Sequence, residues 1–183
     1  MTAPTEKPGG SSRWNEARPF TPFQGATIHV NEANARELQE GLLSILRAEG
    51  PTVGERLMRV YCASSGGRLR DTAKKRLSRS ITSLVRKNLI LEFNPSNAGR
   101  VSARTYGLPG DDPRRMRTLG GRKPTEVPLL ERAEAVKRAR AVSPGADRIA
   151  LLRVAVRLMG GQPLSGDRSE AFGEALDWLE SQR

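Results

Sequence analysis

Apolar residues recur at helical spacing from about Asn34 onward. Asn34 and Glu37 are spaced like a helix N-cap and its reciprocal partner, and they precede a stripe of leucine and isoleucine. Gly50-Pro51 is a pair that typically ends a helix. The pattern therefore predicts a first helix between these two signals, with an apolar face made by Leu38, Leu42, Ile45 and Leu46.

Two more helices are expected directly afterwards. Thr52 and Glu55 match a capping box, which predicts the start of the second helix, and the Ser-Ser-Gly-Gly run at 64–67 ends it. The third helix is predicted over 72–87. Its inner face consists of Ala73, Leu77, Ile81, Leu84 and Val85.

The pattern then changes to that of a β-hairpin over 89–106. Residues 89–93 form an apolar strand-like run, 94–99 are rich in turn formers, and 101–105 alternate as a return strand would. Three helices followed by strand, loop and strand are the order of a winged helix-turn-helix. We therefore expect a mainly α fold with a small β-hairpin, in which a winged helix at 31–108 precedes a C-terminal helical extension.

The remaining segments differ in composition. Residues 109–127 begin with a Pro-Gly-Asp-Asp-Pro run and are predicted to be a linker, and 128–183 carry helical periodicity. The C-terminal helices are expected at about 128–142, 147–159 and 169–181.

The first 30 residues are rich in Pro, Gly, Ser and Thr and lack periodicity, so 1–30 are predicted to be a disordered tail. Three aromatic residues in this tail are an exception: they could dock on the protein's own body or on a partner, although a loosely packed arm is the favoured interpretation. They are Trp14, Phe20 and Phe23.

Charge is concentrated in one block. The 183 residues include 31 Lys and Arg and 20 Asp and Glu, for a net charge of +11. Residues 55–104 alone carry 12 basic and 3 acidic side chains, or +9. Such a block indicates a polyanion partner, because Lys and Arg that neutralise phosphates release condensed counterions. The alternative is a solvated basic surface that keeps the protein soluble.

These features together predict double-stranded DNA as the partner. The helix at 72–87 would enter the major groove, with Arg79 as the best candidate for a bidentate guanine contact. The preceding turn would hold phosphates, and the hairpin 89–106 would reach the flanking backbone or minor groove. The predicted DNA contacts are Arg68, Arg70, Lys74, Lys75, Ser78, Arg79, Thr82, Arg86, Arg100 and Arg104.

Catalytic chemistry is not expected. One His and one Cys exclude a zinc finger or a disulfide framework, and no Gly-rich loop ends in Lys-Ser or Lys-Thr to hold a triphosphate. His29 has no candidate partner nearby, Cys62 falls on an apolar helix face, and Asp111-Asp112 is typical of a turn. We predict no enzyme activity, no cofactor and no metal.

Location and partners follow from the same evidence. No apolar run approaches the roughly 20 residues of a membrane span, and the N-terminus lacks a secretory pattern. We therefore predict a cytoplasmic protein, which would be associated with the nucleoid if it binds DNA. A homodimer or a protein partner would add the affinity that a lone winged helix lacks. Two alternatives stay open: an adaptor in a DNA-processing or defence complex that docks a protein through its C-terminal helices or aromatic tail, and a transcriptional regulator.

Three stretches also carry a resemblance to a known family. They are Glu49-Gly50-Pro51 with Glu55-Arg56-Leu57, Arg76 to Ile81 with Leu84-Val85, and Leu108-Pro109-Gly110 with Thr125 to Pro128. Residues 38–140 resemble the winged-helix-like domain found near the C-terminus of large bacterial helicase/nuclease-like proteins, some linked to DNA restriction and phage defence. The resemblance implies a DNA-associated module. Because the motor and nuclease domains are lacking, it implies neither helicase nor nuclease activity.

Overall fold

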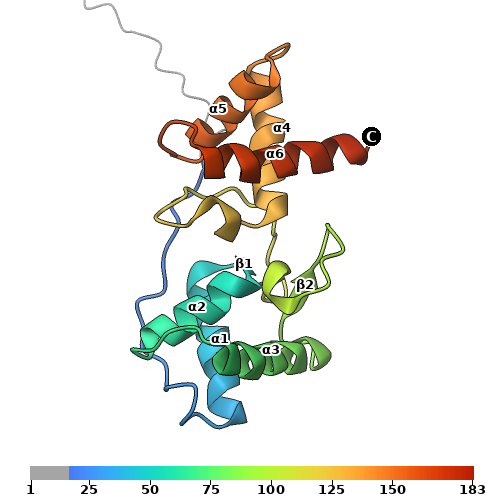
Figure 1. Ribbon diagram of the computed structural model, residues 1–183. Helices are drawn as coiled ribbons and strands as arrows, with labels where there is room; N and C mark the ends of the chain where they lie inside the picture. The colour runs from blue at the N-terminus through green and yellow to red at the C-terminus, as the bar shows by residue number, and fades with distance from the viewer. Residues whose placement is uncertain (1–16) are drawn as a thin grey trace, which may run out of the picture.

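The computed structural model describes residues 17–183, which form a mainly helical protein with a small antiparallel sheet (Figure 1). The α-helices are α1 (Ala35–Glu49), α2 (Gly54–Ser64), α3 (Asp71–Arg86), α4 (Leu129–Val142), α5 (Arg148–Leu158) and α6 (Gly166–Ser181). The strands are β1 (Thr52–Val53), β2 (Leu91–Phe93) and β3 (Thr105–Gly107), and short 3₁₀ helices occur at η1 (Val101–Ala103) and η2 (Pro124–Glu126). The expected mixture of many helices and a small hairpin is confirmed at this level.

Helix α1 begins where its capping signal predicts. The Asn34 side chain accepts from the backbone N–H groups of Arg36 and Glu37, and the Glu37 carboxylate accepts from the Asn34 N–H at 2.7 Å. The chain leaves the helix at Gly50, whose φ of 71° favours glycine.

The predicted capping box at the start of α2 is wrong. Thr52 lies in β1, where it pairs with Tyr106, and its hydroxyl donates to the Gly50 carbonyl at 2.8 Å. Pairing with β3 satisfies the backbone here, so Val53 and not Thr52 is the N-cap, and the helix begins at Gly54, one residue later than predicted. Its first residue must be small, because a Cβ on Gly54 would overlap the Val101 carbonyl oxygen. This close approach depends on a distant segment, so local sequence does not reveal it.

The hairpin is present, but its return strand lies later in the chain than the alternation at 101–105 predicts. Residues 101–103 form η1, and β3 follows at Thr105–Gly107, paired with β2 in the register Leu91↔Gly107 and Phe93↔Thr105. β3 is the central strand, because β1 pairs with its other edge in the order β1-β3-β2. The alternation of side-chain types along 101–105 is typical of a strand. However, residues 101–103 pack against α2 and α3 as η1, and this tertiary packing overrides the local pattern.

Two hydrophobic cores divide the described chain. The N-terminal unit, from α1 to β3, buries a cluster around Leu42, Leu57 and Leu77. The C-terminal unit, built on α4, α5 and α6, buries another around Val136 and Phe172, and Figure 1 shows it stacked on the first. The predicted linker at 109–127 is only partly a linker, because Met116, Leu119 and Val127 belong to the second core.

Residues 17–30 differ from the disordered tail predicted for them. Phe20 and Val30 are buried, and the Thr118 N–H donates to the Arg18 carbonyl at 2.7 Å. Phe23 packs against the first core. Phe20 and Phe23 therefore dock on the protein itself, and the favoured interpretation of a loosely packed arm is wrong for this part of the segment. Trp14 lies outside the described residues.

Candidate nucleic-acid interface

Helix α3 is held on three sides. Its inner face packs in the core through Leu77, Ile81 and Leu84. One flank lies on α1 and the segment before it, where the Arg76 guanidinium donates to the carbonyls of Val30 (2.6 Å) and Ala33 (2.8 Å). The other flank faces α2. Helix geometry leaves one stripe that points away from the protein, and this stripe consists of Lys75, Arg79, Thr82 and Arg86.

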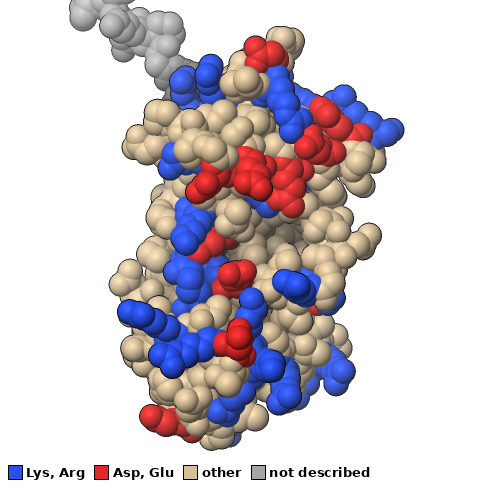
Figure 2. Space-filling model, in the orientation of Figure 1, with Lys and Arg blue, Asp and Glu red and all other residues tan. Residues whose placement is uncertain are grey.

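The cations of this region are open to solvent. Lys75, Arg79 and Arg86 are exposed, as are Arg68 and Arg70 in the turn before the helix, while Lys74 is half-buried. Among residues 17–183, none of these six side chains has an ion-pair or hydrogen-bond partner. Figure 2 shows Lys and Arg gathering over α3, at the lower right of the molecule. The C-terminal unit does not cover this face.

Two predicted contacts on α3 are instead used within the protein. The Ser78 hydroxyl donates to the Met58 sulfur at 3.6 Å, and the Thr82 hydroxyl donates to the Ser78 carbonyl at 2.9 Å. Both side chains are half-buried. Thr82 lies on the outer stripe and its bond is local, whereas Ser78 faces α2.

The two hairpin arginines also differ. Arg100 is exposed and has no side-chain partner among the described residues. Arg104 donates to both oxygens of Glu92, at 3.1 and 3.0 Å, and to the carbonyls of Ala98 and Gly99. It therefore closes the hairpin loop.

A buried ionic network between the two units was not expected from the sequence. Arg56 of α2 donates to both oxygens of Glu49 (2.7 and 2.8 Å) and to Glu126 of η2 (3.0 Å), and Arg59 also binds Glu126. Glu49 and Glu126 lie 7 and 70 positions from Arg56 in the sequence. Only the long-range fold brings these charges together, although Arg56 and Glu126 both lie in the stretches that carried the family resemblance.

A second buried cluster adjoins the first. Glu131 of α4 is 0% exposed and accepts from Arg122 at 2.9 and 3.1 Å and from Arg117, whose guanidinium also donates to the carbonyls of Glu49 and Pro51. The Phe20 ring lies 4.3 Å from the Arg122 guanidinium carbon, 5.1 Å from that of Arg56 and 5.7 Å from that of Arg117. One aromatic ring from the N-terminal segment thus contacts both clusters.

Ionisation in this network follows from the geometry. Burial, the largest influence on Glu126, disfavours its charge. The hydrogen bond from the Lys123 N–H and the charges of Arg59 and Arg56 outweigh it, so the pKa of Glu126 lies below its ordinary value of 4.5. Burial lowers the pKa of Arg122, although Glu131 opposes that effect.

The residues considered for catalysis have structural roles. Asp111 accepts from the Leu108 N–H (2.7 Å) and Asp112 from the Arg114 N–H (2.9 Å), as expected of a turn. Cys62 is buried, which raises its pKa, and His29 accepts a long bond from the Asn31 N–H. Within residues 17–183, no three His, Cys, Asp or Glu side chains gather so that they could hold a metal ion.

No helix in the described part of the chain combines the length and apolar character needed to cross a membrane. The chain matches no family model, no curated protein and no solved structure.

Proposed function

We propose that this protein binds double-stranded DNA without catalysing a reaction, using the outer stripe of α3 and the hairpin of β2 and β3. The observation that carries the proposal is a set of six cations on α3 and the turn before it that have no partner within the part of the chain that the structure describes. A cation already paired with a carboxylate gains little from a phosphate, whereas an open one neutralises the phosphate and releases a counterion.

The element order supports a winged helix-turn-helix. Helices α1, α2 and α3 are followed by the β2–β3 hairpin, and β1 joins the hairpin as a third strand. In such a module α3 is the recognition helix, and the width of the major groove accepts an α-helix. Lys75 and Arg79, on the outer stripe, would point most directly toward base edges.

Under this proposal, some of the other predicted residues contact DNA directly and one acts indirectly. Arg68 and Arg70 precede the helix and suit the phosphate backbone, and Arg100 extends from the hairpin loop. Arg104 would act indirectly, because its guanidinium holds that loop closed. Trp178 of α6 adds a second restraint, since its indole N–H donates to the Pro95 carbonyl at 3.2 Å.

The test is a titration of a mixed-sequence duplex, followed by fluorescence anisotropy across a salt series. About six phosphate contacts predict a slope of log K against log salt near −5, at about −0.9 for each contact. The double variant Lys75→Glu/Arg79→Glu is expected to weaken binding by at least about tenfold and to make the slope shallower by about 2.

A matched control exists on α5. Arg153 and Arg157 are exposed, have the same spacing of four residues as Lys75 and Arg79, and lie in the C-terminal unit. Arg153→Glu/Arg157→Glu changes the net charge by the same amount, so binding should stay close to wild type. Equal losses in both double variants would contradict the assignment of the interface to α3. An affinity for a binding partner that changes neither in these variants nor with salt would favour the adaptor alternative.

A further inference from the structure

A groove lined by Arg18, Arg114 and Arg115, the arginine groove, lies at the junction of the two units. Its first part is a hollow of about 340 Å³, bounded by the N-terminal segment, the loop at 112–116 and α4. A second hollow of about 260 Å³ continues it toward the end of α1, and the two share Arg18, Asp112 and Arg115. The groove exists only in the folded protein, because its walls come from segments far apart in the sequence.

The first hollow has an excess of positive charge. The charged residues that line it are four arginines and two carboxylates, namely Arg18, Arg114, Arg115 and Arg138 with Asp112 and Glu134. Arg138 donates to Glu134 at 2.9 Å, so these two charges neutralise each other. Asp112 offsets one of the other three arginines. Two positive charges therefore remain in this hollow.

The second hollow does not change this balance. It adds Arg47 and Arg117, together with Glu49 and Asp111. Arg47, Arg117 and Glu49 are each bound to side chains of opposite charge, and counting these partners leaves the total charge of the second hollow at zero. The excess positive charge therefore lies in the part of the groove next to α4.

The three remaining arginines are open to a partner. Arg18, Arg114 and Arg115 are exposed, and their side chains make no hydrogen bond or ion pair with any residue from 17 to 183. Their backbone is fixed, because the Arg18 N–H donates to the Met116 carbonyl and the Arg115 N–H donates to the Asp112 carbonyl, both at 3.1 Å. A backbone that is already ordered lowers the cost of ordering these side chains on binding.

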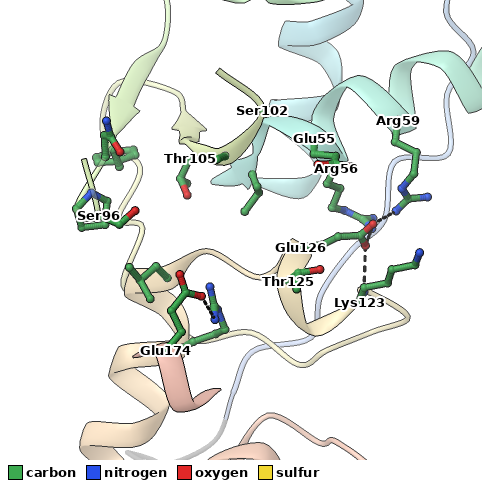
Figure 3. A pocket seen from close by; sticks show the side chains of 17 residues that line it. Glu55, Arg56, Arg59, Ser96, Ser102, Thr105, Lys123, Thr125, Glu126 and Glu174 are labelled. Atoms are coloured by element: carbon green, nitrogen blue, oxygen red, sulfur yellow. Dashed lines mark hydrogen bonds and ion pairs between the residues drawn. The ribbon is translucent and has the colours of Figure 1, made fainter. Parts of the chain in front are cut away.

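A larger cavity between the units, of about 480 Å³, differs in this respect (Figure 3). In Figure 3, Arg56 and Arg59 lie against Glu126, to which both are bound. Arg132, which lines the same cavity, binds Glu174 at 3.0 Å. The arginines of that cavity are thus neutralised within the protein, whereas those of the arginine groove are not.

The chemistry of the groove suits a chain of phosphates. A guanidinium group is planar, and its N–H groups can donate to two phosphate oxygens at once. Sites for small organic molecules are mostly enclosed and apolar, whereas this groove is lined mainly by exposed, charged side chains. An extended polyanion therefore fits the groove better than a single small ligand does.

We propose that the arginine groove is a second DNA-binding surface, which contacts the phosphates of a duplex other than the one bound by α3. Figure 1 shows α3 at the lower end of the molecule and α4 in the unit above it. Because the two surfaces belong to different parts of the molecule, one protein molecule can join two duplexes. This inference rests on the proposed function of α3 but concerns different residues.

A bead assay on the full chain tests this inference. One short mixed-sequence duplex is fixed to beads, and a fluorescent copy of it is captured only where the protein holds both. The wild-type protein should capture the second duplex, and capture should fall steeply as salt is added. Arg114→Glu/Arg115→Glu should reduce capture by at least about fivefold, while the affinity for a single duplex stays within about twofold of wild type.

Two control variants show whether the loss is specific. Arg153→Glu/Arg157→Glu on α5 changes the net charge by the same amount and should capture like wild type. Arg114→Gln/Arg115→Gln removes the charges without adding carboxylates beside Asp112, and it should also reduce capture. All these variants should unfold at the wild-type temperature, because the replaced side chains have no partner among residues 17–183.

Two results of the bead assay would overturn the inference. The first is an absence of capture by the wild-type protein. The second is wild-type capture by Arg114→Glu/Arg115→Glu, which would show that a dimer joins the duplexes through two copies of α3.

Single-duplex binding separates failure of this inference from failure of the proposed function. The binding that remains in Lys75→Glu/Arg79→Glu should have a salt slope near −2.7, at about −0.9 for each of three phosphates, and adding Arg114→Glu/Arg115→Glu should abolish it. Remaining binding that ignores this addition would overturn the groove alone. Wild-type affinity in Lys75→Glu/Arg79→Glu would overturn the assignment of α3 instead. Equal losses in the two double variants would indicate one continuous surface and overturn the joining of two duplexes.

Discussion

Arginines on α3 and arginines on α4, α5 and α6 face different surroundings. Those on the outer stripe of α3 have no carboxylate partner among the described residues. Those of the C-terminal unit are divided: Arg132, Arg140 and Arg148 are paired with Glu174, Glu180 and Asp177, whereas Arg153 and Arg157 of α5 are exposed and have no partner among residues 17–183. Figure 2 shows the contrast, with acidic side chains over α6 and basic ones over α3. The count of arginines says little about binding, whereas the supply of nearby carboxylates decides which arginines are available.

The junction between the units shows a third situation. Arg56, Arg117 and Arg122 are buried and each meets carboxylates, carbonyls or both. A buried guanidinium that loses its carboxylate partner stays out of contact with water, and its charge is then uncompensated. An exposed guanidinium is hydrated whether or not it is paired. Substitutions at the junction should therefore change stability, and substitutions on α3 should change binding.

The largest effect is expected at Glu131. Glu131→Gln keeps the shape of the side chain but removes the charge that neutralises Arg117 and Arg122. The free energy of unfolding should fall by about 3–5 kcal/mol, measured by denaturant titration. Glu180→Gln removes one partner of an exposed pair and should cost less than about 1 kcal/mol. Similar losses in the two variants would contradict the distinction between buried and exposed pairs.

On α3 the expected effect is on binding. Arg79→Ala should weaken DNA binding by about 1–3 kcal/mol and relax the preference among sequences, because a base contact would be lost. Arg68→Ala should weaken binding to all sequences to a similar degree, as loss of a phosphate contact does. Anisotropy with a panel of duplexes measures both. The unfolding free energy should change by no more than about 0.5 kcal/mol in either variant. Wild-type binding by both variants would rule out α3 as the recognition helix.

A smaller effect is expected where the two units meet at the hairpin. Trp178→Phe keeps the packing of the ring but removes the donor to the Pro95 carbonyl. The unfolding free energy should fall by about 1 kcal/mol, and amide hydrogen exchange should become faster in the loop at 94–104. Unchanged exchange in that loop would show that α6 does not restrain the hairpin.

The smallest effect concerns pH. The pKa of Glu126 is lower in the folded protein than its ordinary value of 4.5, so the unfolded chain binds this proton more tightly. Its contribution to stability is complete above that value and is lost as the pH falls through the folded pKa. Glu126→Gln should therefore make the unfolding free energy less dependent on pH below about 4.5. The same substitution at exposed Glu32 controls for the loss of one negative charge. An unchanged dependence in Glu126→Gln would contradict the assignment.

Local sequence was informative where neighbours along the chain decide the structure. The bond between Asn34 and Glu37 spans three residues, and the inner face of α3 follows from helical spacing around Leu77. Both were predicted. The start of α2 and the position of β3 were not, because β1, β3 and η1 are settled by pairing and packing between distant segments. The docking of Phe20 is of the same kind.

The sequence by itself determined the basic block at 55–104, the two helices α2 and α3 that carry much of it, and the apolar faces of those helices, since each depends on residues within a few positions of one another. Only the tertiary structure decided which cations are open and which are paired with carboxylates far away in the sequence, as Arg56 is with Glu126 across 70 positions. Pairing and burial depend on distances through space, and those are set when the chain folds.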